Sequence, residues 1–346
     1  MFMPLALALV SIVPPQGQPA FRQPQIAVHG EQVGVTFGSK EAIYFAGSKD
    51  NGRTFSEPVK VASPKNFALG RHRGPRIAID DRAIVISAVA GELGGGKDGD
   101  VIAWRSADGG KTWSGGVRVN DVAGSAREGL HAMAAGKGGQ LFAAWLDLRA
   151  KGTRIYGASS TDGGATWSKN VLVYESPGGT VCQCCHPSVA IDAAGNVAVM
   201  FRNALGGNRD MYAAKSADGG KTFGAARKLG DGSWPLDACP MDGGGVAIDS
   251  EGRIFSAWRR DSEVFFAPVG KPETRLGRGK DPALATAGGR TFVVWSEGQS
   301  LKAGQPGESR PMTLSESGAY VSAAAGGAVF AAWEEGERGI SIRRLD

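Results

Sequence analysis

Long apolar runs are missing from this sequence of 346 residues. The apolar stretch at the start, Met1–Val13, is too short for a helix that crosses a bilayer, so we expect no transmembrane segment. Charged residues make up only 21% of the chain, with a net charge of +5, and no cluster of lysine and arginine is interleaved with aromatic residues. The lack of such a cluster argues against nucleic acid as a partner.

Lysine and arginine are also missing before Arg22. The opening apolar run is nevertheless followed by prolines and small residues, an order typical of a secretory signal peptide. We therefore expect residues 1–20 to be a signal peptide, cleaved between about Pro15 and Arg22. Residues 21–346 would then form one domain that is secreted or periplasmic. A buried N-terminal strand is the alternative interpretation of the same run.

Glycine is abundant, at 53 residues, which is about twice its ordinary share. The hydrophobic fraction of 42% is ordinary, and the glycines follow no collagen period. Excess glycine in such a chain indicates many tight turns. The composition therefore favours an all-β architecture.

One motif occurs four times at nearly even spacing. The stretches SKDNGRTF, SADGGKTW, STDGGATW and SADGGKTF all fit Ser-x-Asp-x-Gly-x-Thr-aromatic, and their first residues are 54 to 58 positions apart. We expect the Asp to accept backbone N–H groups across a hairpin, the Gly to adopt a positive φ angle, and the aromatic ring to pack beneath. The motif residues are Ser48, Asp50, Gly52, Ser106, Asp108, Gly110, Trp113, Ser160, Asp162, Gly164, Trp167, Ser216, Asp218, Gly220 and Phe223.

The motif belongs to a longer repeated unit that occurs seven times. Each unit has an apolar strand, a Gly turn and a second strand, and three late units keep these without the motif: GGVAIDSEGRIFSAWRR, PALATAGGRTFVVWSEG and AYVSAAAGGAVFAAWEEG. A four-stranded sheet that cannot bury both faces alone packs radially against its neighbours. We predict a β-propeller of seven blades, each a four-stranded antiparallel sheet, with the segment around Pro19 to Gln25 closing the last blade.

The four motifs resemble the Asp box of the bacterial neuraminidase repeat, which marks sialidases and many β-propellers without sialidase activity. Sialidase catalytic domains have six blades, so six is the alternative to seven. The resemblance implies a sialidase-like glycoside hydrolase, such as an exo-sialidase that acts on sialylated glycans. A non-catalytic propeller that binds a glycan or a protein is the alternative, as is a propeller that binds a metal. No cofactor is implied, and we expect a monomer.

Sialidases hold the substrate carboxylate with three arginines. The segment GPRIAI resembles the strand that carries the first of them, which implies this role for Arg76. The segment MFRNALGGNRD resembles the second and implies Arg202. The third stays open among Arg259, Arg260 and Arg278.

Sialidases also use an aspartate as acid and base and a tyrosine as nucleophile, because a neutral nucleophile avoids repulsion with the substrate carboxylate. The loop GGGKDGDVIAWRSADGG would offer Asp98 or Asp100 as the acid. The segment GAYVSAAAGGAVFAAWEE resembles the late tyrosine segment of the family and implies Tyr320 as nucleophile.

Ligand sites of propellers lie where the links into the first strands meet the loops that follow the second strands. These incoming links and loops are rich in arginine and carboxylate here, which predicts a glycan or other anionic small ligand on the axial face. They include Arg71, His72, Arg73, Glu128, His131, Asp242, Asp281 and Glu334.

Cysteine is scarce, but three of the four cysteines lie at positions 182 to 185 in TVCQCCHPS. The pattern Cys-x-x-Cys-His fits c-type haem attachment, yet a tight link between blades leaves little room for a macrocycle. An even cysteine count in an exported chain favours two disulfides, and because the links into the fourth and fifth blades are neighbours, we predict that at least one joins Cys184 or Cys185 to Cys239. The alternative is a copper(I) or zinc site. Its ligands would come from Cys182, Cys184, Cys185, His186, Cys239 and Met241.

Overall fold

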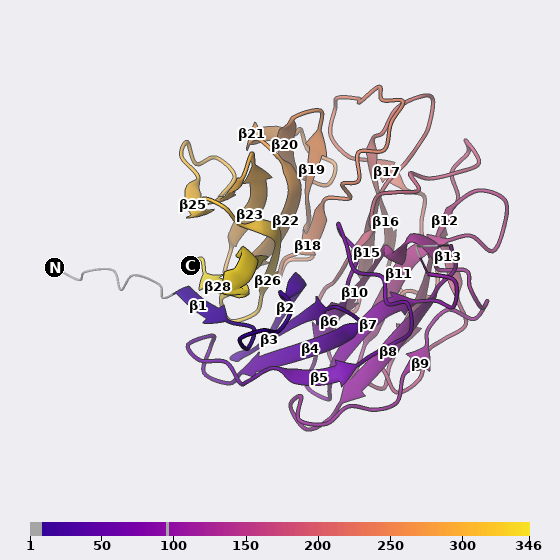
Figure 1. Ribbon diagram of the computed structural model, residues 1–346. Helices are drawn as coiled ribbons and strands as arrows, with labels where there is room; N and C mark the ends of the chain where they lie inside the picture. Colours follow the sequence, from indigo (N-terminus) through magenta and orange to yellow (C-terminus); the bar gives the residue numbers. More distant parts are fainter. Residues whose placement is uncertain (1–8, 95–96) are drawn as a thin grey trace.

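Seven four-stranded antiparallel sheets surround a central axis in the computed structural model, which describes residues 9–94 and 97–346 (Figure 1). The predicted seven-bladed propeller is confirmed, and six blades is excluded. In the described part of the chain, no helix has the length and apolar character needed to cross a membrane.

The strands follow one another around the ring in chain order. Blade one contains β2 (Arg22–His29), β3 (Gln32–Ser39), β4 (Ala42–Ser48) and β5 (Val59–Ala62), and blade two contains β6 (Arg76–Ile79), β7 (Ile84–Ala90), β8 (Asp100–Ser106) and β9 (Val117–Arg118). Blade three contains β10 (His131–Ala135), β11 (Leu141–Asp147), β12 (Arg154–Ser160) and β13 (Val171–Tyr174). Blade four contains β14 (Ser188–Ile191), β15 (Val197–Arg202), β16 (Met211–Ser216) and β17 (Arg227–Lys228).

The later blades repeat the arrangement. Blade five contains β18 (Gly245–Ile248), β19 (Ile254–Arg260), β20 (Glu263–Pro268) and β21 (Thr274–Arg278), and blade six contains β22 (Lys280–Ala287), β23 (Arg290–Glu297), β24 (Ser300–Gly304) and β25 (Met312–Ser315). Blade seven combines β26 (Ala319–Ala325), β27 (Val329–Glu334) and β28 (Ile340–Arg344) with β1 (Leu9–Ile12). Short 3-10 turns lie at η1 (Arg127–Gly129) and η2 (Gly336–Arg338).

The first strand of each blade lines the axis. Each of these strands contacts the first strand of the next blade, and β26 contacts β2, so the ring is complete (Figure 1). Apolar side chains fill the spaces between blades. Between blades two and three, for example, Val85 and Val101 pack with Leu141 and Trp145. Full burial of such a side chain contributes about 1.5–3 kcal/mol to the free energy of folding, which explains why the strand sequences are runs of apolar residues.

All four Asp boxes lie on the turns between the third and fourth strands, as predicted. In the first box, the Ser48 hydroxyl donates to Asp50 Oδ1 at 2.7 Å and accepts the Gly52 N–H at 2.9 Å. Asp50 also accepts the N–H of Thr54 at 2.9 Å and its hydroxyl at 2.7 Å. The other three boxes repeat these bonds.

The box glycine and aromatic residue join adjacent blades. Gly110 has φ +90°, and a Cβ there would overlap the ring of Phe45 from blade one. The indole of Trp113 packs edge-on against the same ring, with 5.5 Å between centroids. The first, second and fourth boxes therefore let an aromatic ring of the preceding blade approach the turn, and in the third box the side chain of Val85 takes this place against Gly164.

The strand that closes blade seven differs from the prediction. It is β1, whose residues Leu9 to Ile12 pair with Arg343 to Ile340 of β28. Pro19 to Gln25 instead lead into β2, the inner strand of blade one, where Phe21 packs on Phe37. The prediction was wrong because both segments are short and apolar at intervals, and only ring geometry places one at the outer edge. Cleavage between Pro15 and Arg22 would remove β1 from the propeller.

We expect β1 to stabilise the propeller. Ile12 is buried, whereas Leu9 at the other end of the strand is 55% exposed. Ile12→Ala should therefore cost about 2–5 kcal/mol of unfolding free energy, while the matched control Leu9→Ala should change it by no more than about 0.5 kcal/mol. Denaturant unfolding of the full chain measures both. Equal stability of the two variants, or a mature chain from the native host that starts after Pro15 and is no less stable, would contradict a structural role for β1.

The Asp boxes predict a dependence of stability on pH. Burial opposes ionisation of Asp162, but hydrogen bonds from Thr166 and Ser160 outweigh it and lower its pKa to about 2, from an ordinary 3.8. A carboxyl whose pKa is lower in the folded state stabilises the fold above its unfolded pKa, and this contribution disappears as the pH falls from about 4 to about 2.

Asp162→Asn should therefore lower the melting temperature by a few degrees at pH 7, and its difference from the wild type should shrink between pH 4 and pH 2. Thermal unfolding followed by circular dichroism checks this, with the exposed Asp237→Asn as the control. A difference that is constant with pH would contradict the assigned role of the carboxylate.

Candidate functional site

The incoming links meet at one end of the axis, around a cavity of about 190 Å³. Its wall includes His72, Arg76, His186 and Asp281. The same inner strands continue along the axis around a second, more apolar space of about 230 Å³. The polar end of the channel is therefore the part of the axis that offers groups for recognition.

His72 is the hub of the axial end. Its Nε2 lies 2.8 Å from Asp281 Oδ1, and Arg71 donates to the same carboxylate oxygen at 3.1 Å. The His72 ring stacks on His186 at 4.6 Å between centroids, and Tyr320 meets it edge-on at 6.3 Å. Arg22 belongs to the same group, because its guanidinium carbon lies 6.0 Å from the centroid of the Tyr320 ring. We call Arg22, Arg71, His72, Asp281 and Tyr320 the axial mouth.

The backbone at these links is unusual for residues other than glycine. His72, Asp281 and Tyr320 have φ angles of 56°, 56° and 52°. Gln23, Glu128 and Met241 occupy the same left-handed region in other incoming links. Such residues cost about 1–3 kcal/mol each and cluster at binding and catalytic sites. The mouth is therefore held in a conformation that the chain does not adopt by local preference.

Charge at the mouth is unevenly distributed. Burial disfavours the Asp281 carboxylate, but its hydrogen bond with His72 and the charges of His72 and Arg71 outweigh this and hold its pKa well below the usual range. Burial raises the pKa of Asp242, and the charge of Asp281 adds to this. Asp242 Oδ2 accepts the Asp281 N–H at 2.8 Å. Burial, together with the charges of His72 and Arg76, holds the pKa of His186 well below its usual value, so His186 is neutral.

Arg76 and Arg202 use their guanidinium groups to hold backbone carbonyls. Arg76 donates to the carbonyls of His72, Gly74, Pro75 and His131, and burial lowers its pKa to about 10. Only 7% of Arg76 is exposed.

Arg202 is 1% exposed and donates to the carbonyls of Arg209, Asp242 and Arg259. Arg76 and Arg202 each tie incoming links or loops of neighbouring blades together. Their predicted role in holding a substrate carboxylate stays a prediction.

The other predicted catalytic residues lie in different places. Arg259 stacks near Trp234 at 5.3 Å and lines a separate hollow with Arg278 and Glu297. Asp98 accepts the N–H groups of two residues in its own loop, and Asp100 accepts bonds from two residues at positions 120 and 124. Tyr320 is the one that belongs to the axial mouth. The structure therefore does not bring the predicted set into one cavity.

The sequence located His72 and Asp281 in the incoming links but gave no reason to select them. Asp281 follows His72 by more than two hundred positions, and only ring closure places the two side chains across the mouth from each other. The sequence feature that could have marked Asp281 is the proline that follows it near the start of β22, since Gln23 in β2 and His186 before β14 are also followed by proline.

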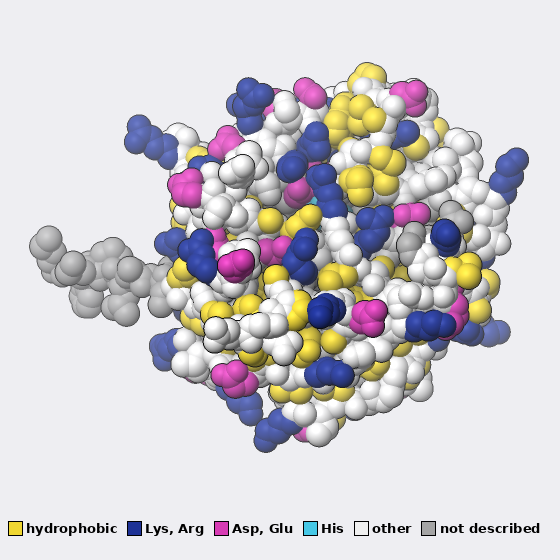
Figure 2. Space-filling model, in the orientation of Figure 1, with side chains coloured by type: hydrophobic (Ala, Val, Ile, Leu, Met, Phe, Trp, Pro, Cys, Tyr) yellow, Lys and Arg dark blue, Asp and Glu magenta, His cyan; other side chains and the backbone are white. Residues whose placement is uncertain are grey.

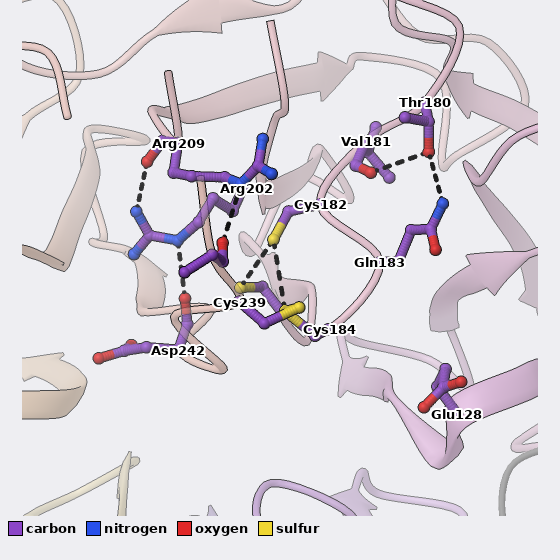
Figure 3. The surroundings of a disulfide bond; sticks show 12 residues. Glu128, Thr180, Val181, Cys182, Gln183, Cys184, Arg202, Arg209, Cys239 and Asp242 are labelled. Carbon is purple, nitrogen blue, oxygen red and sulfur yellow. Dashed lines mark hydrogen bonds between the residues drawn. A yellow bond between two sulfur atoms is a disulfide. The ribbon is translucent and has the colours of Figure 1, made fainter. Parts of the chain in front are cut away.

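The cysteines meet at the links into blades four and five. Cys184 and Cys239 form a disulfide with 6.1 Å between Cα atoms, which confirms one of the two predicted pairings (Figure 3). Cys182 and Cys185 are free and buried, so the expectation of a second disulfide was wrong. Of the six predicted metal ligands, Cys182, Cys184 and Cys185 bring their sulfur atoms within 4.8 Å of one another.

The two free thiols differ in acidity. A hydrogen bond with Cys185 opposes the effect of burial and lowers the pKa of Cys182 to about 7, with help from the charge of Arg202. Burial raises the pKa of Cys185 well above the usual value. His186 lies against His72 instead of completing a ligand set with the cysteines.

Basic and acidic side chains are mixed over the face of the molecule seen in Figure 2. They do not gather there into one basic patch. The polar character of the axial end therefore comes from local pairs of arginine and carboxylate, such as Arg71 with Asp281 and Arg73 with Glu128.

Known structures share this architecture at low sequence identity. The α-L-arabinofuranosidase of Fusarium graminearum, bound to an iminosugar inhibitor, has a TM-score of 0.59 and 16% identity over 83% of this chain and 92% of its own. The α-L-arabinanase of Penicillium chrysogenum, complexed with arabinobiose, has a TM-score of 0.58 and 16% identity over 99% of both chains. The NanB sialidase of Streptococcus pneumoniae has a TM-score of 0.57 and 12% identity over 97% of this chain and 70% of its own.

These likenesses establish the fold. No curated protein matches the sequence. The BNR repeat-like domain family matches residues 25–180 and 95–237 in two overlapping segments that contain all four Asp boxes. Together the segments cover more than half of the chain, and the predicted resemblance to neuraminidase repeats is confirmed by them. The chain belongs to the BNR repeat-like domain family and has a sialidase-like propeller fold.

Proposed function

We propose that this propeller binds the acidic terminus of a glycan at its axial mouth. The observation that carries the proposal is the placement of two partly exposed arginines around one aromatic ring. Arg22 lies 6.0 Å from the Tyr320 ring, and Arg71 reaches the same ring through Asp281 and His72. An aromatic face suits a sugar ring, and arginine suits the carboxylate that an acidic sugar carries.

The two arginines retain donors for a ligand. Arg22 donates a hydrogen bond from Nε to Glu334, and Arg71 donates one from Nη2 to Asp281. Among the described residues, Arg71 Nε is buried without a hydrogen-bond partner, so a ligand would meet the exposed end of the guanidinium and not this nitrogen. Side-chain exposure is 46% for Arg22 and 31% for Arg71, so solvent and a ligand can reach both. A guanidinium with two free N–H groups can hold a carboxylate in a bidentate manner.

The size of the cavity supports binding over the mouth. Its volume of about 190 Å³ is below the roughly 300 Å³ at which ligand pockets usually begin. A sugar would therefore rest on the rim formed by Arg22, Arg71 and Tyr320, with its acidic group directed towards the arginines. The arabinobiose complexes of the arabinanase and the arabinofuranosidase support a carbohydrate ligand for this fold.

Sialidase-like hydrolysis is the second candidate, and the position of Tyr320 at the mouth favours it. The bonds of Arg76 and Arg202 to backbone carbonyls oppose it, because two of the three arginines implied for carboxylate binding have committed their donors. The loop bonds of Asp98 and Asp100 oppose it as well.

Binding can be tested with N-acetylneuraminic acid as the probe and its methyl ester as the matched neutral ligand. We expect the acid to bind and the ester to bind less tightly, because the ester lacks the charge that the arginines recognise. Arg71→Ala and Arg22→Ala should each weaken binding of the acid by roughly 10- to 100-fold, the range for a hydrogen bond to a charged group.

Isothermal titration calorimetry measures these affinities, and exposed Arg53→Ala is the control that should leave them unchanged. Equal affinity for acid and ester, or no effect of Arg71→Ala, would contradict the proposal.

Turnover separates the two candidates. We expect fluorogenic α-sialosides and α-L-arabinofuranosides to remain uncleaved, because no carboxylic acid among the predicted catalytic residues faces the mouth. Steady release of fluorophore that is lost in Tyr320→Phe and retained in Arg53→Ala would replace the binding function with hydrolysis. Circular dichroism of each variant ensures that a loss reflects chemistry and not unfolding.

A further inference from the structure

The proposed glycan function makes no use of the four cysteines, which are arranged in two layers. The disulfide is the outer layer, because Cys239 is exposed and Cys184 is half-buried. The free thiols of Cys182 and Cys185 are the inner layer, at 3% and 1% exposure. A pair of reduced thiols thus lies directly beneath an oxidised pair that solvent can reach.

The sulfur of Cys182 lies between the two layers. Figure 3 shows it beside Cys184, and the two sulfur atoms are 3.7 Å apart. The Cys185 sulfur lies 3.1 Å from the Cys182 sulfur. The backbone holds it there, since the Cys182 N–H donates to the Arg202 carbonyl at 3.0 Å. The guanidinium of Arg202 is itself buried and fixed by three carbonyls. Disulfide exchange requires a sulfur nucleophile within reach of one disulfide sulfur, and Cys182 meets this requirement.

We propose that the four cysteines form a thiol–disulfide exchange centre, in which one disulfide moves between Cys184–Cys239 and Cys182–Cys185. In the first step the Cys182 thiolate attacks the Cys184 sulfur, the Cys184–Cys239 bond breaks, and Cys239 leaves as a thiolate that takes up a proton. In the second step the Cys185 thiolate attacks the Cys182 sulfur, and Cys184 leaves and is protonated.

The exchange balances within the chain. One disulfide and two thiols are present before and after it, so it needs no external oxidant or reductant. The spacing also permits it, because Cys182 and Cys185 stand in a Cys-x-x-Cys sequence, the spacing of disulfide oxidoreductases. The intermediate Cys182–Cys184 bond joins residues whose Cα atoms are at most about 7 Å apart, close to the upper limit for a disulfide.

The exchange gives the buried thiols a route to an external disulfide. Once the thiols are at Cys184 and Cys239, the Cys239 thiolate can attack a small disulfide and release one of its halves as a thiol. Cys184 then attacks Cys239 and releases the second half. The external disulfide gains two electrons and two protons, and the protein ends with both of its disulfides formed. The substrate class is therefore a disulfide that can approach the link into blade five.

The exchange also decides whether blades four and five are joined covalently. Cys184 and Cys239 are 55 positions apart, and their bond connects the two links. A Cys182–Cys185 bond lies within one link and connects nothing else. The position of a single disulfide thus sets the covalent connection at the axial end.

Digestion with trypsin shows directly which cysteines are joined by a disulfide. Cleavage after Lys169, Arg202, Lys228 and Arg253 yields one peptide of residues 170–202 with Cys182, Cys184 and Cys185, and another of residues 229–253 with Cys239. The folded protein is alkylated, digested without reduction and analysed by mass spectrometry. A bond between Cys184 and Cys239 links the two peptides, and the exchanged form leaves them separate with Cys239 alkylated.

Two matched variants test the order of the steps. Cys185→Ser removes the second nucleophile, so exchange should stop with a Cys182–Cys184 bond inside residues 170–202 and an alkylated Cys239. Cys182→Ser removes the first nucleophile, so the two peptides should stay linked. In the wild type, the fraction of linked peptides should fall, and the fraction of separate peptides should rise, as the alkylation time is lengthened. This time course tests the proposal even where Cys185→Ser does not fold.

Two results would overturn the proposal. One is linked peptides with unreacted Cys239 in the wild type and in both variants at all times, which would make the disulfide a static clamp. The other is four titratable thiols in denatured, unreduced protein together with one copper(I) or zinc ion per chain, which would make the cluster a metal site.

Discussion

Packing between adjacent blades is the interaction on which the rest of the structure depends. A single blade has two apolar faces and no core of its own, so it is stable only between two others, and the ring must close for every blade to be covered. Trp145 in blade three and Trp333 in blade seven are both fully buried in this way. The Asp boxes reinforce the same contacts, because Gly110 admits the ring of Phe45 from the preceding blade.

Ring closure in turn builds the axial mouth. Arg71 and His72 of the link into blade two reach Asp281 of blade six, and Arg22 of blade one reaches Glu334 of blade seven. These ion pairs connect links from opposite or adjacent sides of the axis. They hold left-handed residues such as His72 and Asp281 in place, and the strain of those residues is supported by the whole ring and not by local sequence.

The sequence was sufficient for features that depend on local chemistry or on regular spacing. The four boxes predicted the turns, the blades and the neighbouring positions of Cys184 and Cys239, because each box makes its own hydrogen bonds. It was insufficient where partners come from distant segments. Nothing in GPRIAI indicates that Arg76 donates to the carbonyl of His131, and nothing in the run Leu9–Ile12 separates a leader peptide from an outer strand, because both require short apolar sequence.

The pairing of β1 with β28 has a mechanical consequence. Leu9 lies opposite Arg343, and Ile12 lies opposite Ile340. The start of β1 and the end of β28 are therefore at the same end of this antiparallel strand pair in blade seven (Figure 1). A pulling force applied to the two ends of the chain would load the backbone hydrogen bonds one pair at a time, as in opening a zipper, and not all together in shear. Tension would open this propeller at blade seven first, while the other six blades, each made from one continuous stretch of chain, still carried no load.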